Sequence, residues 1–110
     1  MFSGKEKPIL EFVLQMIDEA ERVIQRYGTA SSALNDFEGK NAILLNLLQI
    51  GEKLNKIESL EIRAMLPIDE AYSVRNRITH DYDGIDLEIV EEILVGELPI
   101  IKKIIIELLS

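Results

Sequence analysis

KNAILLNLLQIGEKLNKI, residues 40–57, is the stretch of sequence that decides the fold. Its apolar residues recur at intervals of three and four, which is the spacing of one face of an α-helix. Further leucines beside that stripe widen the apolar surface beyond one face. Residues from about 40 to 57 are therefore predicted to form a long helix that is covered on two sides. The stripe consists of Ile43, Leu47, Ile50, Leu54 and Ile57, and the additional leucines are Leu44, Leu45 and Leu48.

A second amphipathic helix is predicted on the N-terminal side of this stretch. Residues 8–27 show apolar positions at the same helical spacing, with Glu and Arg between them. Pro8 suits the first turn of a helix, because its missing N–H has no partner there. Gly28 suits the position just after the last turn.

Two connectors flank the central helix. Residues 29–39 are rich in Ser, Ala, Asn and Gly, which predicts a loop with one short helical turn. A serine is expected to cap that turn, either Ser31 or Ser32. Residues 58–66 have a mixed composition and are predicted to be a connector.

Two more helices are predicted in the C-terminal half. Pro67 can open a helix that continues to about Tyr82, and Gly84 can end it. Asp86 is predicted to cap a last helix, because a short carboxylate accepts hydrogen bonds from backbone N–H groups in the first turn. Pro99 is expected to kink that helix, since it removes a backbone donor.

These elements predict an all-α protein, an antiparallel up-and-down four-helix bundle with short extra helical turns, in a single domain over residues 1–110. The apolar surface of residues 42–50 and of residues 104–106 exceeds what four helices readily hide. We therefore expect self-association, most simply as a two-fold homodimer. The alternative is that these residues fill the core of the monomer.

Composition limits the classes of function. The formal net charge is −8, which disfavours a broad electrostatic nucleic-acid binder and leaves DNA outside the expected partners. The chain has no cysteine and one histidine, so neither a thiolate site nor a multi-histidine site is possible, and we expect no metal and no other cofactor. It has no long apolar run, and residues 1–7 lack a signal-peptide pattern, so we expect a cytoplasmic protein without a membrane span.

One segment concentrates side chains that can carry chemistry. RNRITHDY, residues 75–82, falls at the end of a predicted helix and contains His80. Histidine is the side chain whose ordinary pKa lies nearest neutrality. A lone histidine is usually structural, but Arg75, Asn76 and Tyr82 accompany this one in a mostly acidic chain. The segment is therefore a candidate functional site.

Helix geometry places these groups relative to one another. Asn76 and His80 share a face, whereas Arg75 lies about 140° around the helix from His80. The long arginine side chain can close that gap and hold a phosphate beside the imidazole. Such a set suits RNA phosphodiester cleavage, in which the neighbouring 2′-hydroxyl is the nucleophile and no metal is required. Asn76 supports the set either by a hydrogen bond to His80 or by capping backbone groups, and one histidine for both acid and base roles requires help from Tyr82 or from the partner subunit's His80.

The same eight residues resemble the Arg-x-x-x-x-His-x-Tyr signature of HepT proteins, a toxin branch of the HEPN superfamily. Three other segments are similar to helices of that family, so the resemblance covers nearly the whole chain. It implies a HEPN-like fold and the toxin component of a toxin-antitoxin system, a metal-independent endoribonuclease that acts on RNA as a homodimer with the two motifs facing a shared cleft. The three segments are LLNLLQIGEKLNKI, YDGIDLEIVEEILVGELPIIKKI and ILEFVLQMIDEAERVIQRYG.

The resemblance also implies roles for individual residues and a protein partner. Arg75 and His80 would be catalytic, and the partner would be MntA, a minimal nucleotidyltransferase antitoxin. Tyr82 would be the residue that MntA modifies with AMP, adding bulk and negative charge where an RNA phosphate must bind. The family often has an aromatic residue before the signature helix, whereas this chain has LPID at residues 66–69, a difference that concerns packing more than chemistry.

Ordinary structural roles are the alternatives for these residues. Arg75 can form a surface ion pair with Asp69 or Glu70. Tyr82 can cover the helix end with its hydroxyl in water. Arg77 can steer RNA or simply be solvated.

The remaining polar residues near the segment are left open. Asp81 and Asp83 would repel a phosphate, so they either point away or tune His80. Gln49 and Glu52 on the central helix can line a cleft, but a solvated face is the simpler account and they are not included in the site. Two alternative functions are a non-catalytic adaptor or substrate- or nucleotide-binding subunit of a minimal nucleotidyltransferase, which the charge favours, and a purely structural dimer.

Overall fold

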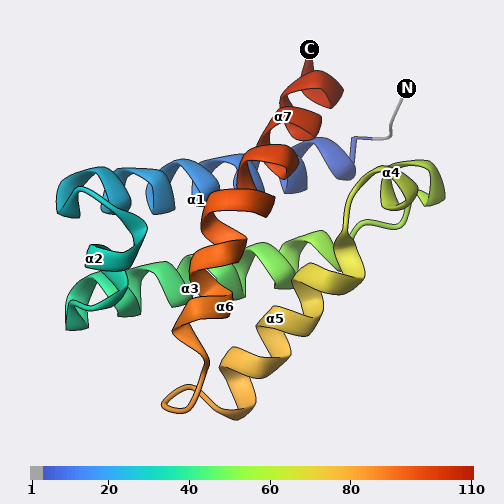
Figure 1. The fold of residues 1–110 in the computed structure, drawn as a ribbon. Helices are drawn as coiled ribbons and strands as arrows, with labels where there is room; N and C mark the ends of the chain where they lie inside the picture. Colours follow the sequence, from blue (N-terminus) through green and yellow to red (C-terminus); the bar gives the residue numbers. More distant parts are fainter. Residues whose placement is uncertain (1–3) are drawn as a thin grey trace.

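The computed structural model describes residues 4–110, all of whose regular elements are helical. Two long helices, α1 (Glu6–Tyr27) and α3 (Phe37–Leu54), lie side by side and run in opposite directions (Figure 1). The short helix α2 (Ala30–Leu34) joins them. The prediction of an all-α helical bundle is confirmed.

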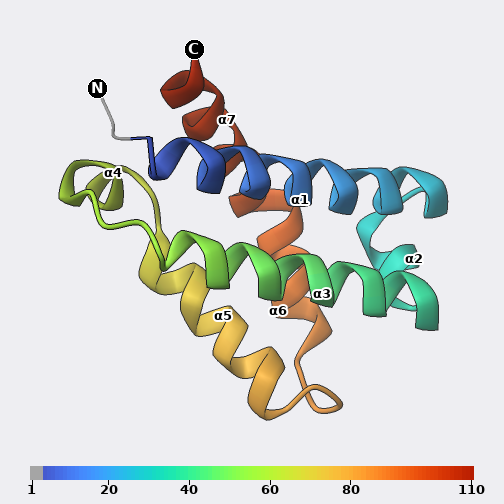
Figure 2. The same ribbon diagram turned by 180° about the vertical axis from the view of Figure 1, so that it is seen from behind.

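The C-terminal half crosses this pair steeply. Helix α5 (Ile68–His80) packs against α3, and α7 (Leu98–Leu109) packs against α1. Figure 2 shows from behind that α5 and the segment containing α6 and α7 run in opposite directions and are joined at one end by a short loop. We call the continuous helical segment of α6 (Leu87–Glu92), η1 (Ile93–Glu97) and α7 the α6–α7 arm.

The core is one cluster of buried side chains to which all the α-helices and the π-helical turn contribute. On α3, Leu44 is fully buried and Leu48 is partly buried, but Leu45 is 57% exposed. In the C-terminal run, Ile105 is fully buried whereas Ile106 is 47% exposed. Most of the wide apolar surface therefore lies inside the single chain, and Leu45 and Ile106 remain outside it. The predicted stripe of Ile43, Leu47, Ile50, Leu54 and Ile57 is buried throughout.

The predicted cap of α1 is confirmed, whereas the predicted cap of α2 is not. Gly28 follows α1 with a φ of 95°, a conformation that glycine adopts without strain. The short helical turn is α2, but the expectation of Ser31 or Ser32 as its cap was wrong. The cap is Thr29, whose extended backbone leaves its hydroxyl free to accept the N–H of Ser32. Both serines already lie inside the helix, where a residue cannot serve as the N-cap.

Several helix bounds differ from the predicted ones, and α1 begins at Glu6, two residues before Pro8. Helix α3 begins and ends three residues earlier than predicted, and the connector at residues 58–66 contains a further helix, α4 (Leu60–Met65), capped by Ser59. Helix α5 ends at His80, two residues before Tyr82, because Asp81 leaves the helical conformation. Asp86 caps α6 as predicted, accepting the N–H of Glu88 at 2.9 Å.

The irregularity predicted at Pro99 appears just before it. Pro99 lies in the first turn of α7, and the preceding residues Ile93–Glu97 form a π-helical turn. Proline cannot donate a backbone hydrogen bond, so the turn that precedes it is free to widen. Among the described residues, no helix is long and apolar enough to cross a membrane. The signal-peptide expectation falls partly on residues 1–3, which lie outside the described residues.

Asp36 couples the start of α3 to the end of α1 and provides a prediction on stability. Its carboxylate accepts N–H groups from Glu38 and Gly39 at 3.0 Å each and the Tyr27 hydroxyl at 2.7 Å. The Tyr27 bond, then the backbone bonds, lower the pKa of Asp36 below its ordinary 3.8.

We expect Asp36→Asn to melt at a lower temperature than the parent at pH 7. Because the pKa is lowered on folding, the stabilisation is present above the unfolded pKa and is lost as pH falls through the folded one. The gap in melting temperature should therefore narrow between about pH 4 and pH 2, as circular dichroism melts can measure. Exposed Glu11 on α1 offers the control, Glu11→Gln. A gap of constant size across this range would contradict the assignment.

Candidate active site

The site is built on a close approach of α5 to α3. A Cβ added at Gly51 of α3 would lie 2.5 Å from the Ala71 carbonyl oxygen and 2.7 Å from the Arg75 Cβ. Only glycine permits this distance between the two backbones. Gly51 was not predicted as part of the site, although a lone glycine inside an amphipathic helix is itself a sign of close packing.

Arg75 is held against α3 at this contact. Its Nε lies 2.6 Å from Oε1 of Glu52, and both side chains are largely covered. The buried Nε–H is not directed at that oxygen, so the contact is an ion pair without hydrogen-bond alignment. The guanidinium also lies over the Tyr72 ring, 5.4 Å from its centroid. The expected alternative partners were wrong: Glu52 takes this place, and Asp69 instead lies 3.9 Å from Arg63.

Asn76 connects Arg75 to the face that carries His80. Arg75 Nη1 donates a hydrogen bond of 2.9 Å to the Asn76 side-chain oxygen. On α5 Asn76 lies between the directions of Arg75 and His80, at about 100° from the first. Neither alternative considered for Asn76 occurs in the part of the chain that the structure describes, because its carbonyl orients Arg75 instead. Arg75 Nη2 forms no hydrogen bond with the described residues.

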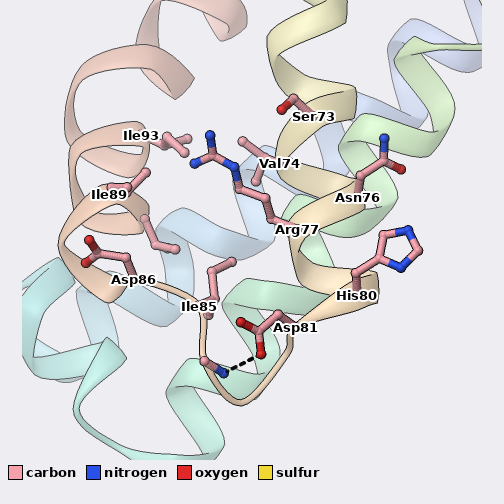
Figure 3. A pocket seen from close by; sticks show the side chains of 12 residues that line it. Ser73, Val74, Asn76, Arg77, His80, Asp81, Ile85, Asp86, Ile89 and Ile93 are labelled. Atoms are coloured by element: carbon pink, nitrogen blue, oxygen red, sulfur yellow. Dashed lines mark hydrogen bonds between the residues drawn. The ribbon is translucent and has the colours of Figure 1, made fainter.

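His80 is the last residue of α5 and is exposed. Figure 3 shows Asn76 and His80 extending from one side of the helix and Arg77 from the other, across a cavity toward the α6–α7 arm. This cavity has a volume of about 420 Å³, and Asn76, Arg77 and His80 line it, whereas Arg75 does not. Arg77 lines this cavity but is exposed, so both roles considered for it, steering RNA and simple solvation, stay open.

Tyr82 folds back onto the first half of α3. Its hydroxyl donates to the side-chain oxygen of Asn41. Burial, and then the charge of Asp83, raises the pKa of the Tyr82 phenol above its ordinary value. The ring is nevertheless 37% exposed. Tyr82 is therefore a protonated, oriented hydroxyl at neutral pH, and its face remains accessible.

Asp81 is turned away from His80. Its carboxylate accepts the N–H of Gly84 at 3.2 Å, and Figure 3 shows this bond closing the loop after α5. Asp81 was expected either to point away from a bound phosphate or to tune His80, and this contact agrees with the first possibility. Asp83 acts on Tyr82 through its charge.

A single face of α3 carries both contacts to the motif. Asn41, Leu45, Leu48 and Glu52 follow one another at intervals of four, three and four, so they form one stripe. Asn41 binds Tyr82 at one end, and Glu52 binds Arg75 at the other. Exposed Leu45 lies between them. Glu52, which the sequence analysis left out, is thus part of the site.

Within the described residues, no cluster of three or more His, Cys, Asp or Glu side chains is arranged to hold a metal ion. The segment carries a guanidinium, an amide, an imidazole and a phenol. Arg75 and Asn76 are joined by a hydrogen bond, whereas within residues 4–110 no hydrogen bond joins either of them to His80 or Tyr82. Fixed positive charge and proton transfer are the chemistry that such groups offer.

An all-α bundle with this arginine–histidine segment at the end of α5 is consistent with the architecture of a HEPN-like protein. A family model described as "Ribonuclease HepT-like" matches residues 13–108, from the first half of α1 almost to the end of α7. The chain therefore belongs to the HepT-like ribonuclease family. Comparisons with curated proteins and with solved structures give no match.

Proposed function

We propose that this chain is a toxin-type, metal-independent endoribonuclease that works in the cytoplasm as a single domain over residues 1–110. The observation that carries the proposal is the hydrogen-bonded pair of Arg75 and Asn76, with exposed His80 one turn after Asn76 on α5, in a member of a ribonuclease family. Arg75 is oriented through Nε and Nη1, which leaves Nη2 for a phosphate oxygen. His80 is exposed and therefore open to a substrate.

The proposed reaction is transfer within the RNA strand. The 2′-oxygen attacks the neighbouring phosphorus, the bond from phosphorus to the 5′-oxygen breaks, and a 2′,3′-cyclic phosphate and a 5′-hydroxyl result. Arg75 neutralises the charge that grows on the phosphate oxygens, and His80 moves the proton. Because one imidazole cannot take and give a proton at the same moment, a second group is needed, either Tyr82 or the partner subunit's His80.

A homodimer supplies that second group, and the α3 stripe supports one. Leu45 is a large apolar side chain exposed between Asn41 and Glu52, the two residues that contact the motif. Burying Leu45 against a second copy brings two motifs to a shared cleft around a two-fold axis. Tyr72 and Leu48 are partly buried on the same side of the α3–α5 contact and extend the apolar patch.

The direct test is cleavage of RNA without metal. The purified protein should cut a mixed-sequence RNA oligonucleotide in the presence of EDTA and leave a cyclic phosphate, which mass spectrometry detects. The matched substrate is the same oligonucleotide in DNA, which lacks the 2′-hydroxyl and should stay intact. Cleavage of both oligonucleotides, or of RNA only when divalent metal is added, would overturn the mechanism.

We further propose that Tyr82 is the control point and that the partner is an MntA-type nucleotidyltransferase antitoxin. The phenolic oxygen attacks the α-phosphorus of ATP, pyrophosphate leaves, and the phenolic proton is lost to a base of the partner. The product cannot donate to Asn41, because the O–H is gone, and it carries a phosphate charge beside the site. Both changes oppose RNA binding.

Tyr82→Phe tests this regulation. After incubation with such a nucleotidyltransferase and ATP, the parent should gain the mass of AMP units and lose cleavage activity, whereas Tyr82→Phe should gain none. Tyr72→Phe is the control, because it removes the hydroxyl of another half-buried tyrosine, on α5, and should not alter the mass gain. An equal gain of mass in Tyr82→Phe would exclude Tyr82 as the acceptor.

The alternative function is a non-catalytic adaptor that presents a nucleotide or substrate to a nucleotidyltransferase. The net charge of −8 favours it, because most of the surface repels RNA. Protein that leaves RNA intact but binds ATP or the nucleotidyltransferase tightly would support this alternative.

A further inference from the structure

A groove separates α5 from the α6–α7 arm. Helix α5 packs against α3, whereas the arm packs chiefly against α1. Two adjoining cavities of about 420 and 410 Å³ lie between them and share Val74, Arg77 and Ile93. The first is the cavity beside His80 in Figure 3, and the second continues it toward the start of α5. The bundle is therefore open along the side of α5 that faces away from Glu52.

The floor of the second cavity is apolar. It is formed by residues of α3, α5 and the arm. The π-helical turn helps to keep one row of the arm's side chains directed at the groove. In a regular α-helix, each step of four residues turns the side-chain direction by about 40° around the helix axis. The wider turn at Ile93–Glu97 offsets this drift, so that Ile89, Ile93, Glu97 and Ile101 all line the groove. The apolar floor comprises Leu47, Ile50, Val74, Ile93, Leu98 and Ile101.

The rim of the same cavity is acidic. Glu70 on α5 and Glu92 and Glu97 on the arm line it, and none of the three has an ion-pair partner within residues 4–110. Asp69, the fourth carboxylate, lies 3.9 Å from Arg63. Arg77 is the one cation among the described residues that line it. An apolar floor between unpaired carboxylates is complementary in charge and shape to a cationic amphipathic segment.

We infer that this acid-rimmed groove binds a helical segment of a partner protein with an apolar face flanked by Lys and Arg. The apolar face covers the floor, and the basic side chains pair with Glu70, Glu92 and Glu97. A second copy of the chain is disfavoured because it also carries a charge of −8, and RNA is disfavoured because the rim repels phosphate. The inference does not rest on RNA cleavage, and the groove lies away from Leu45.

The test uses a short fluorescent helical peptide with Leu on one face and Lys on the other, titrated into the full chain. It should bind, and the Glu92→Gln/Glu97→Gln double variant should weaken binding about tenfold, as expected for the loss of two partly exposed ion pairs. The matched control is Glu11→Gln/Glu107→Gln, which removes the same charge at exposed positions outside the groove. Equal weakening by both double variants would overturn the proposal.

Apolar substitutions separate the possible occupants. Ile89 is 38% exposed and lines both cavities, so Ile89→Ser should weaken peptide binding, whereas Ile106→Ser, at 47% exposure outside the groove, should not. Sedimentation equilibrium should give the same subunit number for both variants. If Ile89→Ser instead dissociates an oligomer, the groove is an interface between copies and the proposal fails. If the Glu92→Gln/Glu97→Gln double variant also weakens binding of an RNA oligonucleotide, the second cavity is an RNA surface and the proposal also fails.

Discussion

Replacing His80 with alanine is expected to lower the rate of RNA cleavage by about 10²–10⁴-fold, the usual contribution of a general acid–base group. His80 ends α5 with its side chain in solvent, so the substitution removes a proton carrier and little packing. Expression of the parent chain without a partner should slow growth, and expression of His80→Ala should not. The measurement is the single-turnover rate of cleavage at saturating protein, because this rate does not depend on product release.

Thermal unfolding decides whether a loss of cleavage in His80→Ala is chemical. We expect its melting temperature to lie close to that of the parent, because exposed side chains contribute little to stability. The control is Lys103→Ala, an exposed cation on α7 far along the chain from the motif, which should leave cleavage unchanged. Equal cleavage and equal toxicity of His80→Ala would remove this residue from the mechanism.

The fold was largely predictable because burial follows the periodic residues. The stripe of α3, the caps at Gly28 and Asp86, and the all-α class all follow from local spacing and short-range hydrogen bonds. The errors fall where neighbouring residues compete for one role. Thr29 and Ser31 are both good caps, and only the extended backbone of Thr29 decides between them.

The site was predictable only along its own helix. Arg75, Asn76, His80 and Tyr82 stand together in the sequence, so they are recognisable as a group. Their contacts on α3 are distant in the chain: Asn41 lies 41 residues from Tyr82. Finding such contacts requires the register of α5 against α3, which depends on how closely two backbones approach. No periodicity of a single helix encodes that distance.

The direction of the Arg75 side chain also could not be predicted from the sequence. The helical wheel places Arg75 about 140° from His80, and the sequence predicts that the long arginine side chain closes this gap and holds a phosphate beside the imidazole. In the structure Glu52 and Asn76 hold the guanidinium first. The guanidinium is therefore already oriented and partly neutralised by groups of the chain itself, before any ligand binds.

Gly51→Ala is expected to damage both stability and cleavage, since it acts on the register itself. The new methyl would lie 2.5 Å from the Ala71 carbonyl oxygen and 2.7 Å from the Arg75 Cβ, so α5 must move away from α3. Overpacking of this kind lowers the free energy of unfolding by about 1–3 kcal/mol, and this loss equals or exceeds the gain of about 1 kcal/mol from the higher helix propensity of alanine. A shift of Arg75 by about 1 Å can lower cleavage about 10²-fold.

Gly96→Ala is the matched control, because a methyl at Gly96 meets nothing within 4 Å. It should leave cleavage unchanged and stability equal or slightly higher. Glu52→Gln separates the two effects of Gly51→Ala: it keeps the backbone contact but removes the charge that holds Arg75. If Arg75 is positioned through α3, Glu52→Gln should weaken RNA binding or cleavage with little change in melting temperature. Full activity of both Gly51→Ala and Glu52→Gln would mean that the contact between α3 and α5 serves packing alone, and that Arg75 reaches the phosphate without orientation from Glu52.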